Sequence, residues 1–139
     1  MQVQTVMDSQ GQESLETRFG KVAYSAKSEI SFPAGIVGMP GQSKFVIAEM
    51  PDERMRKFQV MQSLVEEDIS FAVLPLESLG DLLEKQDLDD VCEVLNIAED
   101  SLLVMLITSI HKTADGNAKL SVNLRAPVFI DVSTKRGHQ

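Results

Sequence analysis

Tryptophan is missing from this sequence of 139 residues, and cysteine occurs once. A single cysteine cannot form an internal disulfide, which is typical of proteins in a reducing compartment. The longest apolar run, Leu102–Ile110, is far shorter than the roughly 20 residues that a helix needs to span a bilayer. The N-terminus shows no basic segment followed by an apolar run, as a secretory signal would. We therefore expect a cytoplasmic protein without membrane contact.

Basic residues are also scarce. The sequence has 13 Lys and Arg against 21 Asp and Glu, which gives a net charge of −8. Proteins that bind nucleic acid need cationic side chains to replace the counterions of the phosphates, so this charge argues against direct contact with nucleic acid. The same charge favours a protein partner with a basic surface.

The organisation along the chain predicts one domain. Residues 1–16 are rich in Gln, Ser and Glu without a clear period, and we expect them to form a flexible leader. Residues 17–139 read as a single domain of short strands, with a hairpin turn at Asp115-Gly116 between Leu102–Ile110 and Lys119–Val132. Leu102–Ile110 is apolar on both sides of the pleat, which predicts a central strand. The predicted fold is mainly β, a small antiparallel β-barrel-like domain.

A short two-helix insertion is expected at about residues 76–96. Apolar residues recur at helical spacing in Leu76–Lys85 and again in Leu88–Leu95. We expect Asp87 to cap the second helix and Asn96 to end it.

Candidate catalytic residues are few. Cys92 lies on the apolar face of an acid-rich predicted helix, a setting that disfavours a thiolate and predicts a buried structural cysteine. His111 and His138 have no partner at a metal-ligand spacing. Glu66, Glu67 and Asp68 form an acidic turn of a kind that is usually just solvated. No catalysis, metal or cofactor is therefore expected.

A proline interrupts the last predicted strand. Pro127 cannot donate to a β-ladder, so the strand must have an edge, a bulge or a bend there. In one interpretation the side chain of Asn123 satisfies backbone groups that the proline or a bulge leaves open. In another, the strand has an open edge near Pro127 that accepts a strand from a partner.

Several motifs, in order, resemble those of the FliW family of flagellar assembly factors. They are Phe32-Pro-Ala-Gly-Ile36, Met61-Gln-Ser63, Asn123-Leu-Arg-Ala-Pro-Val-Phe-Ile130 and Lys135-Arg-Gly137. The resemblance extends from Thr17 to Gln139. It implies a non-catalytic β-barrel-like protein that binds the RNA-binding translational regulator CsrA, relieves repression of flagellin translation, and also binds flagellin. The alternative is a flagellin-specific chaperone without a translational role.

Charged and polar residues beside the predicted strands lead to an expectation about the partner site, and the resemblance leads to one about the end of the chain. We expect Glu66, Glu67 and Asp68 to face CsrA, with Asn123 and Arg125 at the edge of the nearby sheet. We expect a monomer. The sequence stops where the family normally continues into one more strand, which leaves two interpretations, a shortened chain or a less closed barrel.

Overall fold

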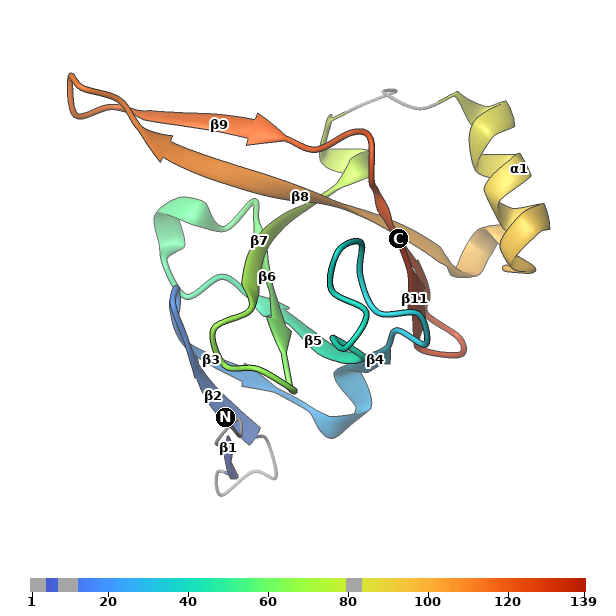
Figure 1. Ribbon diagram of the computed structural model, residues 1–139, viewed down its shortest axis with the longest axis horizontal. Helices are drawn as coiled ribbons and strands as arrows, with labels where there is room; N and C mark the ends of the chain where they lie inside the picture. The colour runs from blue at the N-terminus through green and yellow to red at the C-terminus, as the bar shows by residue number, and fades with distance from the viewer. Residues whose placement is uncertain (1–4, 8–12, 80–83) are drawn as a thin grey trace.

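Strand pairing closes one sheet into a barrel. The computed structural model describes residues 5–7, 13–79 and 84–139 (Figure 1). The strands are β1 (Thr5–Met7), β2 (Glu13–Thr17), β3 (Gly20–Tyr24), β4 (Glu29–Ser31), β5 (Lys44–Glu49), β6 (Gln59–Ser63), β7 (Ser70–Pro75), β8 (Leu102–Lys112), β9 (Ala118–Val122), β10 (Val128–Asp131) and β11 (Arg136–His138). Within the described residues, the eight-stranded sheet has the strand order β10-β11-β4-β5-β6-β7-β8-β9, and β10 also pairs with β8. The barrel therefore has seven strands, with β9 outside the ring.

The predicted mainly β, antiparallel barrel-like fold is confirmed, with one parallel pair. β11 pairs antiparallel with β10 and parallel with β4, at Arg136 and Ser31. The expectation of a less closed barrel is wrong, because Arg136–His138 provides the strand that joins the two ends of the sheet. Three residues are too short for a periodic pattern, so this strand could not be predicted from alternation.

Alternation along the strands builds two cores on opposite faces of the sheet. Phe45 and Met61 belong to the core inside the barrel, together with Phe32 and Ile130. Their neighbours Val46 and Val60 belong to a second core, which lies on the outer face of β5–β7. The β2–β3 hairpin covers that outer face with Leu15, Val22 and Tyr24.

Order begins earlier than the sequence predicted. β2 starts at Glu13, pairs with β3, and buries Leu15 to 2% exposure. β1 pairs with β2 through residues 5–7. The prediction of a flexible leader is therefore wrong for residues 5–7 and 13–16, and residues 1–4 and 8–12 lie outside the described part of the chain. This strand was not predicted because the segment is mostly polar and only one residue of the strand, a leucine, is buried.

The predicted two-helix insertion contains one described helix, α1 (Lys85–Leu95). The first predicted helix is a 3-10 turn at Leu76–Leu79, and residues 80–83 lie outside the described residues. The helix α1 begins earlier than predicted, because its N-cap is Glu84 and not Asp87. Asn96 does end it, with a φ of 56° and its N–H directed to the carbonyls of Cys92 and Glu93.

The β8–β9 hairpin extends beyond the barrel (Figure 1). β8 is a central strand, as predicted, because it pairs with β7 on one edge and with both β9 and β10 on the other. The predicted turn lies at Thr113–Asn117, and Gly116 has the positive φ of 84° that its turn position requires. Among the described residues, no helix has both the length and the apolar character needed to cross a bilayer.

Closure of the barrel depends on a glycine. A Cβ atom on Gly137 would lie 2.3 Å from the ring of Phe32, which is fully buried and packs edge-on against Phe45 with 5.3 Å between ring centroids. β11 can therefore approach the interior closely enough to pair with both neighbours only if residue 137 has no side chain.

We expect Gly137→Ala to lower the free energy of unfolding by about 2 kcal/mol or more, because the methyl group overpacks the barrel interior. Urea denaturation measures this value. Gly41→Ala is the matched control, since a Cβ there meets nothing within 4 Å. Equal stability of the two variants would contradict the proposed role of Gly137. Adding Phe32→Leu should recover part of the loss in Gly137→Ala.

Candidate functional site

Side chains of the Met61-Gln-Ser63 motif form hydrogen bonds to the backbone of the acidic turn between β6 and β7. The Ser63 hydroxyl accepts hydrogen bonds from the N–H groups of Val65 and Glu66, both at 3.0 Å, and donates one to Gln42 at 2.5 Å. The Gln62 amide donates to the carbonyl of Glu67 at 3.0 Å. Gln62 and Ser63 are fully buried. These bonds fix the backbone of the turn, so that Glu66, Glu67 and Asp68 project outward and are exposed.

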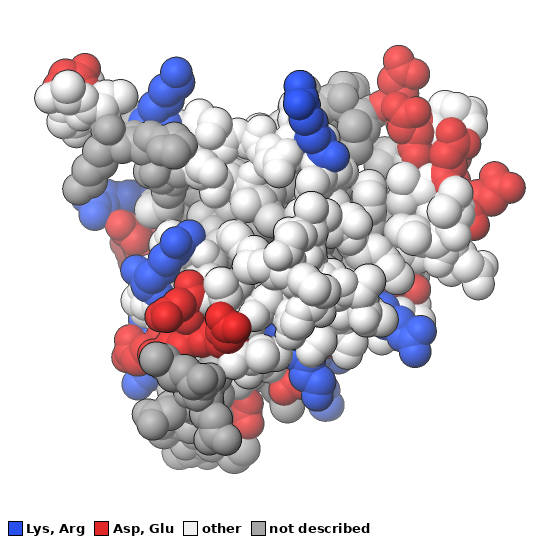
Figure 2. Space-filling view, in the orientation of Figure 1, with Lys and Arg blue, Asp and Glu red and all other residues white. Residues whose placement is uncertain are grey.

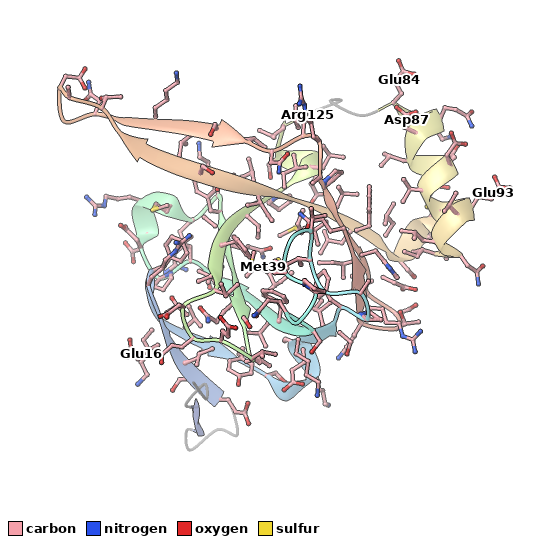
Figure 3. All side chains as sticks on the ribbon, in the orientation of Figure 1. Glu16, Met39, Glu84, Asp87, Glu93 and Arg125 are labelled. Carbon is pink, nitrogen blue, oxygen red and sulfur yellow. The ribbon has the colours of Figure 1, made fainter. Side chains whose placement is uncertain are left out.

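A second segment adds to this acidic surface. Glu67 and Asp68 line a shallow hollow of about 370 Å³ together with Glu16, Thr17 and Arg18. Figure 2 shows acidic side chains gathered at the lower left, the region in which Figure 3 labels Glu16. Glu16 was not among the predicted site residues, because it falls in the segment 1–16 that was expected to form a flexible leader. The strand periodicity of Glu13–Thr17 was the signal that could have revealed it.

Asn123 and Arg125 do not join the acidic turn. The N–H of Asn123 donates to the carbonyl of Ile107, which pairs with Val73 of β7. The five residues from Val73 back to Asp68, at about 3.3 Å each, place the turn roughly 16 Å along that strand. In Figure 3, Arg125 and Glu16 lie on opposite sides of the molecule. The expected grouping of these residues around one sheet edge is therefore wrong.

The side chain of Asn123 has a structural contact instead. Its Oδ1 accepts a hydrogen bond from the N–H of Arg125 at 3.0 Å, within the connection that leads to Pro127. The expected open edge near Pro127 is not found, because Val128 begins a strand that lies between β8 and β11. In the eight-stranded sheet the open edge belongs to β9, which pairs with β8 alone.

The described residues offer no catalytic or metal-binding constellation. No three of their His, Cys, Asp or Glu side chains lie close enough together to hold a metal ion. His138 is half-buried on β11, and the side chain of His111 lies outside the described part of the chain. Cys92 is half-buried and not buried as predicted. Desolvation, followed by the charges of Asp89 and Glu99, raises the pKa of its thiol, which disfavours a nucleophilic thiolate.

We expect iodoacetamide to alkylate Cys92 at pH 7 more slowly than it alkylates the same cysteine in the urea-unfolded chain. A raised pKa leaves less thiolate at this pH, so the rate should keep rising above pH of about 8.5, where an ordinary thiol titrates. Mass spectrometry of timed samples measures the rate. Asp89→Asn should accelerate the reaction by removing one of the charges. Equal rates in the folded and unfolded chain would contradict the assignment.

Comparisons with known proteins agree with this architecture. The family model described as FliW protein matches residues 13–139, beginning where β2 begins. The flagellar assembly factor FliW of Clostridium novyi (strain NT) is 33% identical over 128 residues, covering 90% of this chain and 85% of the relative. The flagellar assembly factor FliW of Borreliella burgdorferi (strain ZS7) is 30% identical over 112 residues, covering 80% and 82%.

A crystal structure of the flagellar assembly factor FliW shares the fold, with a TM-score of 0.67 and 22% identity over 89% of this chain and 84% of that chain. The family match spans both the barrel and the β2–β3 hairpin that covers its outer core. The chain therefore belongs to the FliW family of flagellar assembly factors.

Proposed function

We propose that the protein is a non-catalytic, cytoplasmic and monomeric binding protein that sequesters CsrA, relieves repression of flagellin translation, and also binds flagellin. The observation that carries this proposal is a large negative charge that the fold leaves available to a partner. The net charge is −8. The described residues contain two ion pairs, Arg54–Asp52 and Arg56–Glu49, so most of their acidic side chains lack a fixed cationic partner.

An RNA-binding regulator must carry a basic surface to neutralise phosphates, and an acidic protein can compete for that surface. We propose that the turn with Glu66, Glu67 and Asp68, extended by Glu16, faces CsrA. Its backbone is held by hydrogen bonds from Gln62 and Ser63, so the turn keeps its backbone conformation when no partner is bound. Asn123 and Arg125 lie on a different side of the molecule and are not part of this surface.

The purified protein should release CsrA from a flagellin leader RNA. We expect the CsrA-shifted RNA band in a gel-shift titration to return to the position of free RNA as the protein is added. Adding purified flagellin to the same mixture should restore the shifted band if flagellin and CsrA compete. The protein without CsrA should leave the RNA unshifted, because its charge repels phosphates. An unchanged CsrA–RNA complex at saturating protein would contradict the proposal.

Charge reversal should identify the surface that meets CsrA. We expect Glu66→Lys/Glu67→Lys to slow association with CsrA by about tenfold at low ionic strength, and by less in high salt, where charges are screened. Stopped-flow fluorescence measures the association rate. Glu84→Lys/Glu93→Lys, at and within α1, is the matched control with the same change in net charge. A larger effect of the control pair would contradict the assignment to the acidic turn without contradicting sequestration of CsrA.

The alternative function is that of a flagellin-specific chaperone without a translational role. The observation that favours it is the open edge of β9, which could accept a strand of flagellin. Leu120 on this strand is 44% exposed. A pull-down that retrieves flagellin and never CsrA would favour the chaperone. Retrieval of both partners would favour the regulatory function.

A further inference from the structure

The helix α1 is only partly packed against the barrel. None of its side chains is fully buried, although Leu88 contacts a small core cluster around Leu76, Val104 and Leu106. Val94 is 81% exposed, the largest exposed fraction among the prominent apolar side chains of the described surface. A helix with this much exposed apolar surface has a face that the rest of the fold leaves without a partner.

A hollow lies between α1 and the last two strands. Its walls are Val91, Val94 and Leu95 from the helix and Phe129 and His138 from β10 and β11, and its volume is about 290 Å³. This hollow adjoins a second one at the β4–β5 loop, because His138 and Gln139 line both. Val37, which is 66% exposed, lies in the second hollow. Together they form a groove from Val94 across Phe129 to Val37, mainly apolar beside α1 and mixed in polarity at the β4–β5 loop, which we call the α1–β11 groove.

The floor of the α1–β11 groove is held by hydrogen bonds of Gln139. Its Oε1 accepts from the N–H of Val37 at 2.7 Å, and its Nε2 donates to the carbonyl of Ala126 at 3.0 Å. One side chain thus links the β4–β5 loop to the connection before β10. The groove therefore exists as a preformed depression, and binding in it need not first order these loops.

Acidic side chains border the groove on the helix side. Asp87, Asp90 and Val94 follow helical spacing along one stripe of α1, and Asp90 itself lines the hollow. Asp90 accepts a hydrogen bond from Gln86 at 2.9 Å, but no acidic side chain of α1 is in an ion pair within the described ranges. Figure 3 shows Glu84, Asp87 and Glu93 on the helix, and Figure 2 shows their region as strongly acidic beside a largely uncharged face.

We infer that the α1–β11 groove binds an amphipathic helix of a partner protein, with apolar residues on one face and Lys or Arg beside them. The apolar residues fill the hollow at Val94 and Phe129, and the cations lie against Asp87 and Asp90. A partner strand is excluded as the occupant because β10 and β11 are each paired on both edges, so the groove offers no free ladder. A small cofactor is disfavoured because the hollow, at about 290 Å³, lies at the lower limit of ligand-sized pockets and opens widely to the surface.

This docking surface is separate from the acidic turn at Glu66–Asp68, and the inference goes beyond the proposed function. It states the chemistry of a bound segment and does not depend on whether CsrA is sequestered. Its test uses a synthetic probe and neither CsrA nor flagellin, so failure of this inference and failure of the proposed function can be told apart.

The probe is a short helical peptide with leucines at i, i+3, i+4 and i+7 and lysines flanking them. It is titrated into the full ¹⁵N-labelled chain, and fluorescence anisotropy of a labelled peptide gives the Kd. We expect the amide signals of Val91, Val94, Phe129 and His138 to shift. Replacing the lysines by glutamates should weaken binding by about tenfold or more, since like charges across a contact repel.

Three variants test the groove itself. Val94→Ser should raise the Kd by about fivefold or more through lost apolar contact. Leu120→Ser, which removes a similarly exposed apolar side chain on β9, should leave the Kd unchanged. Asp87→Asn/Asp90→Asn should raise the Kd and flatten its dependence on salt. Because these side chains are exposed or half-buried, the variants should keep the wild-type unfolding transition.

Several results would overturn the inference. One is the absence of binding by the lysine peptide, and another is binding of both peptides with equal affinity. Signal shifts confined to the β8–β9 hairpin or to the acidic turn would place the peptide elsewhere. Sedimentation that depends on protein concentration and is abolished by Val94→Ser would show instead that a second copy of the chain covers the groove.

Discussion

The close contact between Gly137 and the ring of Phe32 is the constraint on which the rest of the structure depends. Because residue 137 has no side chain, β11 lies close enough to the interior to pair with β10 and β4 at once. Closure at this point positions Gln139, whose side chain then links the β4–β5 loop to the connection before β10. The same glycine that completes the barrel therefore also shapes the groove beside α1.

At the acidic turn, polar side chains fix the position of the backbone through hydrogen bonds. Gln62 directs its amide N–H groups to carbonyls of the turn, while its Oε1 has no hydrogen-bond partner among the described residues, and neither does the hydroxyl of Ser70 opposite it. Leaving a buried polar atom without a partner costs about 1–3 kcal/mol. The turn is thus held through the amide N–H groups of Gln62, and the buried polar pair of Gln62 and Ser70 lies between the two cores on either side of the sheet.

Sequence patterns predicted the parts of the fold that are local. A run that is apolar on both sides of the pleat identified the central strand β8. Asp115-Gly116 and Asn96 marked the turn and the helix end because each has its own backbone preference. Closure by β11 was missed because it rests on a contact between Gly137 and a residue more than one hundred positions away. The outward turn at Glu66–Asp68 was predictable, but the contribution of Glu16 and the separation from Arg125 come from strand order in three dimensions.

Two acidic regions, at the β6–β7 turn and on α1, lie at different ends of a face that carries little charge (Figure 2). Their fields attract a basic partner over distances of about 10 Å at moderate salt, but neither field alone selects where the partner stays. The place where the partner stays bound is determined by apolar contact, because apolar contact mainly sets the dissociation rate. Charge mainly sets the association rate. The turn offers carboxylates over a shallow polar hollow, while α1 combines carboxylates with the exposed Val94 beside the half-buried Phe129 of β10. Long-lived binding of an apolar, basic segment is therefore favoured at the helix, whereas the turn is suited to rapid electrostatic capture of a basic partner.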